Sequence, residues 1–171
     1  VVVLDSLELG RREATLGAPL VVGDIADADL VTSTITEHGV DSIVHFAAYK
    51  AAGEWREDPG RYFSNNVAKT AALVDAARTV GVDKVVFSSS CSVYGTPERT
   101  PVDEGQAIHP ESVYAETKAI VERVLHWYDQ VHGLRSVSLR YFNAAGASFD
   151  SRIGEDGTQA LNLVPVAFRA V

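Results

Sequence analysis

The stretch Lys84-Val85-Val86-Phe87-Ser88-Ser89-Ser90 decides the fold class. Its apolar, β-branched beginning is typical of a buried strand, and three hydroxyl side chains follow directly. The apolar run is continuous rather than alternating, which favours a parallel sheet covered on both faces. Ligands bind beyond the carboxyl ends of parallel strands, so the serines are expected to follow the strand at a binding edge. The alternative interpretation is an ordinary serine-rich loop.

Further strands and helices are predicted around this stretch. Strands of the same apolar character are Val1 to Leu4, Leu20 to Val22, Ser42 to Phe46 and Ser136 to Leu139. Helices with apolar residues at 3.6-residue spacing are Ala28 to His38, Tyr62 to Val80 and Ser112 to His132. This alternation predicts an α/β fold built on a doubly wound parallel sheet.

Composition argues against several classes of protein. The chain has 171 residues and a net charge of −8 without a Lys/Arg cluster, so nucleic-acid binding is not expected. No apolar run reaches the roughly 20 residues of a membrane span, and no signal peptide is visible. Cys91 is the single cysteine, and the five histidines lack metal-ligand spacing. We therefore expect no metal and a cytoplasmic location, and we interpret His45, inside a predicted strand, as a core histidine.

Tyr114 and Lys118 lie four residues apart, and this spacing places them on the same face of a helix. The lysine charge favours phenolate, so the sequence predicts a Tyr114 pKa lowered from about 10 toward the value that a general base needs. The alternative is a solvated helix face. The hydroxyls of the serine run, Ser88 to Ser90, are candidate donors to the substrate oxygen on which such a tyrosine acts.

Two carboxylates follow the first two predicted strands. Asp5 stands where a dinucleotide-binding fold holds the adenosine ribose, and its charge favours NAD over NADP because it would repel a 2′-phosphate. Asp24 with Ile25 is a candidate adenine contact. The alternatives are a turn or cap aspartate at Asp5 and an Asx-turn at Asp24, and each is as good an interpretation of the single residue.

Eight blocks in order resemble the extended short-chain dehydrogenase/reductase family, and within it the branch that epimerises nucleotide-sugars at C4. The blocks are Val3 to Leu7, Gly23 to Ile25, His45 to Glu54, Asn65 to Val67, Ser88 to Gly95, Tyr114 to Lys118, Leu139 to Gly146, and Arg152 to Asp156. The resemblance implies a Rossmann-like NAD-binding fold. It also implies that Ser90, Tyr114 and Lys118 are catalytic.

The resemblance further implies which residues bind cofactor and substrate. NAD would contact Asp5, Asp24, Ile25, Phe46, Ala47, Ala48, Lys50, Asn65, Ser90, Tyr114, Lys118 and Phe142. The UDP-sugar would contact Lys50, Ser90, Tyr114, Asn143 and Asn162. Residues 1–145 would form part of the NAD-binding domain, and residues 146–171, with a helix beginning near Ala160, the start of the nucleotide-sugar region.

The implied activity is interconversion of UDP-glucose and UDP-galactose through a transient 4-keto sugar. Alternatives are a UDP-pentose 4-epimerase, another nucleotide-sugar enzyme of the family, and a non-catalytic NAD-binding sensor or inactive fragment. A 4,6-dehydratase is disfavoured because Ser90-Cys91 stands where that enzyme has acidic residues. The implied partners are a UDP-sugar and a second copy in a homodimer, with neither nucleic acid nor membrane.

The family's glycine-rich turn, with its strand and helix, is not in the sequence, and most of the C-terminal sugar-binding part is also missing. In the family's strand order the missing strand is central. We therefore expect the strands at Val1 and Leu20 to be separated from the other three. We also expect the 171-residue chain alone to fold poorly and to bind NAD weakly.

Overall fold

The computed structural model describes residues 1–50, 56–155 and 162–170, and it divides the chain into two compact units. The first unit ends at Tyr141 and the second begins at Phe142. The first unit thus ends four residues before residue 145, the predicted end of the NAD-binding region. The roles of the two regions stay predictions. Residues 51–54 of the third sequence block lie outside the described residues.

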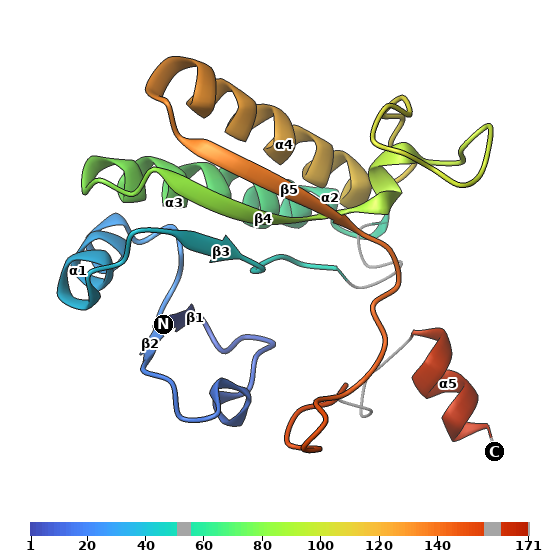
Figure 1. The fold of residues 1–171 in the computed structure, drawn as a ribbon, viewed down its shortest axis with the longest axis horizontal. Helices are drawn as coiled ribbons and strands as arrows, with labels where there is room; N and C mark the ends of the chain where they lie inside the picture. The colour runs from blue at the N-terminus through green and yellow to red at the C-terminus, as the bar shows by residue number, and fades with distance from the viewer. Residues whose placement is uncertain (51–55, 156–161, 171) are drawn as a thin grey trace. The chain divides into compact units, whose positions relative to one another are not determined.

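The strands described in the first unit form two parallel sheets (Figure 1). β1 (Val3–Asp5) pairs with β2 (Leu20–Val22). The second sheet has the order β3 (Ile43–His45), β4 (Lys84–Ser90), β5 (Arg135–Tyr141). Among the residues described, no ladder joins the two sheets, which confirms the expected separation of the first two strands from the other three.

Helices α1 (Ala28–His38) and α4 (Val113–His132) each begin at a side-chain N-cap and end at a glycine in the left-handed region. α1 begins at Asp27, whose carboxylate accepts the Leu30 N–H, and it ends at Gly39 in the left-handed region, at φ 59°. α4 begins in the same way at the Ser112 hydroxyl. Both helices are as predicted, because their caps are visible in the sequence.

The predicted helix from Tyr62 to Val80 is present but is not uniform. It consists of α2 (Pro59–Tyr62), the π-helical turn η3 (Phe63–Ala68) and α3 (Lys69–Thr79) in direct succession. The apolar spacing does not predict the π-helical turn.

Strand β4 is longer than predicted. Its parallel pairing with β5 continues to Ser90 opposite Tyr141, so the serines form the last part of the strand instead of following it. The short turn η4 (Cys91–Tyr94) follows at once. The expectation that the serines come after the strand is therefore wrong, because backbone pairing and not side-chain polarity determines where the strand ends.

The core lies between the second sheet and the helices. One cluster joins α3, β4, α4 and the residue before β5 through Val74, Val85, Phe87, Val121, Leu125 and Leu134. A second joins α1 and α3, and Leu4 of β1 and Ile43 of β3 pack against it. Both sheets thus pack against the same pair of helices, α1 and α3.

The other face of the second sheet exposes Val44 and Val137, so the residues described do not form the second covered face that the sequence predicts.

In the second unit, α5 (Leu163–Arg169) is a single short helix, and its predicted beginning at Ala160 lies outside the described residues. The short turn η1 (Arg12–Thr15) follows β1. No helix in the described ranges combines the length and apolar character needed to cross a bilayer.

Candidate active site

Ser90, Tyr114 and Lys118 come from two neighbouring elements of the first unit. Ser90 ends β4 and caps η4, and its Oγ accepts hydrogen bonds from the Ser92 N–H at 3.2 Å and the Ser92 hydroxyl at 2.9 Å. Tyr114 and Lys118 lie one turn apart near the start of α4, as the spacing predicts. The helix therefore presents both side chains to the carboxyl end of the strand.

Lys118 is buried, with only 3% of its surface exposed. Its ammonium donates to the Ser88 carbonyl at 2.7 Å and lies 4.8 Å from the centre of the Phe87 ring and 5.7 Å from that of Tyr114. Burial lowers the pKa of Lys118 to about 8. The lysine is still mostly protonated at neutral pH and places a positive charge beside the phenol.

The pKa of Tyr114 departs from the sequence-based expectation. Burial raises this pKa, and it outweighs the hydrogen bond with Ser90, which lowers it. The predicted net lowering of this pKa is therefore wrong for this arrangement, because desolvation of the phenolate is the larger effect.

A pocket of about 320 Å³ opens at the carboxyl ends of β1, β2 and β3. Eight of the predicted cofactor contacts line it. The lining residues are Leu4, Asp5, Ser6, Glu8, Leu9, Gly10, Gly23, Asp24, Ile25, Phe46, Ala47, Ala48, Tyr49, Lys50, Asn65 and Lys69. His45 of β3 pairs with Phe87 of β4, so Phe46 and the serines lie at the same sheet edge.

Asp5 and Asp24 both make the turn contacts that the alternative interpretations predict. Asp5 Oδ1 accepts the Leu7 N–H at 2.7 Å, and Asp24 Oδ1 accepts the Ala26 N–H at 2.9 Å. Both carboxylates also line the pocket, so the turn role and the binding role do not exclude each other. A Cβ added at Gly10 would lie 2.7 Å from Asp5 Oδ1, and this close approach favours glycine there.

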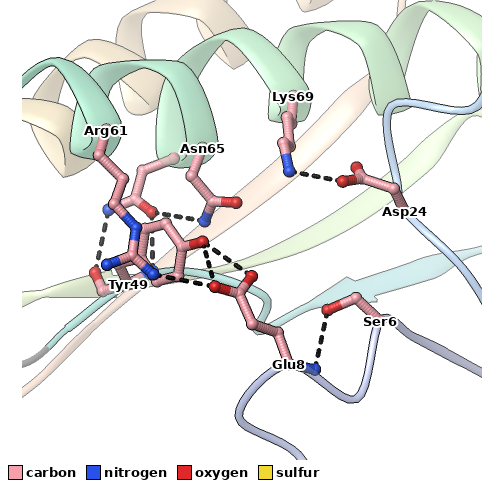
Figure 2. A network of polar contacts seen from close by, with 8 residues as sticks. Ser6, Glu8, Asp24, Tyr49, Arg61, Asn65 and Lys69 are labelled. Carbon is pink, nitrogen blue, oxygen red and sulfur yellow. Dashed lines mark hydrogen bonds and ion pairs between the residues drawn. The ribbon is translucent and has the colours of Figure 1, made fainter.

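Figure 2 shows polar contacts around the pocket that the sequence does not predict. The Tyr49 hydroxyl donates to Glu8 at 2.8 Å, and Arg61 Nη2 donates to Glu8 Oε1 at 2.9 Å. Lys69 Nζ donates to Asp24 Oδ2 at 2.5 Å, and this contact lowers the pKa of Asp24. These contacts connect the loops after β1 and β2 to residues that follow β3.

Two buried polar side chains hold the neighbouring backbone. Asn66 of η3 accepts the Tyr49 N–H at 2.8 Å and donates to the Tyr49 carbonyl at 3.0 Å, which fixes the loop after β3. His45 Nε2 lies 2.8 Å from the Thr70 hydroxyl, and burial lowers the pKa of His45 to about 4. The interpretation of His45 as a core histidine is confirmed. Among the residues described, no cluster of His, Cys, Asp or Glu could hold a metal.

Three predicted contacts belong to the second unit. Phe142 and Asn143 are exposed there, and the Asn162 amide donates to Glu155 Oε1 at 2.5 Å. Their roles toward NAD and substrate stay predictions.

The chain is similar in sequence to curated UDP-glucose 4-epimerases. UDP-glucose 4-epimerase of Rhizobium leguminosarum bv. trifolii is 43% identical over 169 residues, which are 99% of this chain and 52% of that protein. The chain spans about half the length of the curated relatives that it matches.

Solved structures are similar as well. UDP-glucose 4-epimerase from Brucella ovis in complex with NAD is 43% identical with a TM-score of 0.88, over 91% of this chain and 48% of that one. A UDP-glucose 4-epimerase from Stenotrophomonas maltophila, with bound NAD and formylated UDP-arabinopyranose, is 33% identical with a TM-score of 0.93, over 100% of this chain and 55% of that one. A family model described as "NAD dependent epimerase/dehydratase family" matches residues 1–162. This match and the shared fold show that the chain belongs to the NAD dependent epimerase/dehydratase family.

Proposed function

We propose that the protein carrying this chain interconverts UDP-glucose and UDP-galactose at C4, with NAD as its bound cofactor. The observation that carries the proposal is the pairing of Tyr114 with the buried Lys118 beside the serine end of β4. This pair lies at the same sheet edge as the residues that line the pocket. The relatives named above, which cover nearly the whole chain, support the same activity.

The residues of the pocket fit NAD. Asp5 offers a carboxylate to ribose hydroxyls, and Gly10 lies so close to it that a Cβ there would displace this carboxylate. Ile25 offers an apolar surface to the adenine ring, with Asp24 at its polar edge. Asn65 and Lys50 line the same pocket and supply polar groups to the rest of the cofactor. When bound, NAD supplies the hydride chemistry that converts a C4 alcohol to a ketone and back.

The chain's own residues manage the proton and the position of the sugar. Tyr114 takes the proton of the 4-hydroxyl as the sugar is oxidised and returns a proton to the same oxygen when it is reduced. The ammonium of Lys118 stabilises the phenolate, which burial alone disfavours. Ser90 donates a hydrogen bond to the reacting oxygen and orients it. Asn143 and Asn162 are proposed to bind the nucleotide-sugar.

A UDP-pentose 4-epimerase is the second candidate, because it would use the same three catalytic residues. The structure of the Stenotrophomonas relative holds a formylated UDP-arabinopyranose, which supports a pentose as the second candidate substrate. We propose to measure epimerisation of UDP-galactose and UDP-arabinose by the full-length protein. Faster turnover of UDP-galactose is expected. Turnover of the pentose alone would replace the first proposal with the second, and inactivity on both by an NAD-loaded protein would reject both.

We also propose that the full-length protein is a cytoplasmic homodimer that pairs α4 and the helix from α2 to α3 with their copies. Trp127 and Val131, four residues apart on α4, are exposed and support such a contact. Light scattering should give the mass of two chains, and W127E should shift it toward one. A wild-type protein that stays monomeric at micromolar concentration would contradict this proposal.

A further inference from the structure

A second polar network lies beside the serine end of β4, outside the pocket. Arg140 of β5 and Glu122 of α4 form a two-point ion pair, with Nη2 to Oε2 at 2.7 Å and Nε to Oε1 at 3.0 Å. Their side chains are only 20% and 10% exposed, so water screens the pair little. The pair therefore fixes β5 relative to α4.

The ion pair also holds the residues on both sides of Ser90. The Ser89 hydroxyl donates to Glu122 Oε1 at 2.5 Å, which fixes the residue before it. Arg140 Nη1 donates to the Tyr94 hydroxyl at 2.8 Å, and the guanidinium lies 4.9 Å from the centre of that ring. Tyr94 ends η4, the turn that Ser90 caps. The carboxylate thus holds the residue before Ser90, and the guanidinium holds the end of the turn that follows it.

Glu122 belongs to the helix that carries the tyrosine and the lysine. Tyr114, Lys118 and Glu122 follow one another at steps of four along α4, so they form one stripe of the helix. The contact between Glu122 and Ser89 therefore joins this stripe of α4 directly to the end of β4.

We propose that Glu122 and Arg140 are positioning residues that fix the Ser90 hydroxyl relative to the Tyr114 hydroxyl. The proposal rests on the proposed function, since it assigns these two hydroxyls to one reacting oxygen. A misplacement of about 1 Å in such a site lowers turnover by about 100-fold. We therefore expect loss of the network to lower kcat by about 10- to 100-fold, with KM changed by less than about twofold.

The chain offers a matched control on the same strand. Arg135, at the other end of β5, pairs with Asp83 at 3.2 Å, and these side chains are 67% and 54% exposed. This pair also ties β5 to the segment before β4, but it lies at the amino end of both strands, far along the sheet from Ser90.

The experiment uses the full-length, NAD-loaded protein and compares E122Q and S89A with the control D83N. S89A removes a single hydroxyl, so it keeps the test valid if E122Q does not fold. Lower kcat at unchanged KM in E122Q and S89A, with D83N like wild type, is the expected result. Wild-type kcat in S89A and in a folded E122Q would overturn the proposal, and so would an equal loss in D83N.

A second readout does not depend on turnover. The ultraviolet absorbance of tyrosinate is followed against pH for each variant. The same titration of that variant with Y114F added is subtracted, so the difference gives the pKa of Tyr114. Because the hydrogen bond with Ser90 lowers the pKa of Tyr114, a misplaced Ser90 should raise it in S89A and E122Q but not in D83N. An unchanged titration would overturn the positioning role. A wild type that epimerises no UDP-sugar would reject the proposed function, while this titration would still decide the positioning.

Discussion

Acid should destabilise the protein through His45, and replacing this residue with glutamine should remove that sensitivity. His45 is buried, and its Nε2 lies 2.8 Å from the Thr70 hydroxyl. The Thr70 hydroxyl donates its own proton to the Asn66 carbonyl at 2.8 Å, so it can only accept from Nε2–H. The neutral ring therefore carries its proton on Nε2, and protonation at Nδ1 would place a charge in the core.

The pKa of His45 gives the magnitude. Burial, with a smaller contribution from the charge of Lys118, lowers this pKa from 6.5 to about 4. Between these two values the unfolded chain binds a proton that the folded chain does not, so the free energy of unfolding rises with pH across this window. At about 1.4 kcal/mol per pH unit, the folded state loses about 3 kcal/mol as the pH falls from 6.5 to 4.

The assay is urea unfolding of the full-length protein at several pH values from 7.5 to 4.5. Carboxylates titrate in the wild type and in H45Q alike, so the difference between the two isolates the histidine. We expect the wild type to lose about 2–3 kcal/mol more than H45Q over this range. The exposed His126 provides the control, and H126Q should behave like the wild type. A difference between wild type and H45Q that stays constant with pH would refute the reasoning.

Three further predictions concern the pocket, the chemistry and the core. G10A should weaken NAD binding by about tenfold in calorimetry, because its Cβ would displace the Asp5 carboxylate; unchanged affinity would show that Asp5 does not bind the cofactor. Y114F should lower kcat by about 10²- to 10⁴-fold while NAD content stays at one per chain, and near-normal turnover would remove Tyr114 from the mechanism. L125A should lower the free energy of unfolding by about 2–5 kcal/mol in urea melts, whereas a loss below about 1 kcal/mol would mean that the core closes around the gap.

The helices and the parallel strands could be predicted because their determinants are local. Asp27 and Ser112 are visible as caps, and the apolar runs are visible as buried strands. The end of β4 could not be predicted, since it depends on pairing with β5, a strand about 50 residues later in the chain.

The site was accessible from sequence wherever spacing alone decides the geometry, as for Tyr114 and Lys118. The contact of Glu8 with Arg61 joins residues 53 positions apart, and neither lies in a recognisable motif. The direction of the Tyr114 pKa was also out of reach, because burial is a property of the fold and not of a pair of residues.

The π-helical turn η3 interrupts an otherwise regular helix at the place where Asn66 lies. A turn bonded from i to i+5 contains one residue more than an α-helical turn, so a deletion within it should restore a regular helix and leave the directions of α2 and α3 unchanged. The buried Tyr62 of α2 and Leu73 of α3 would stay in place. The consequence falls on Asn66, which bonds both the N–H and the carbonyl of Tyr49. A deletion that removes Asn66 would therefore release the loop after β3, although the helix around it stays intact.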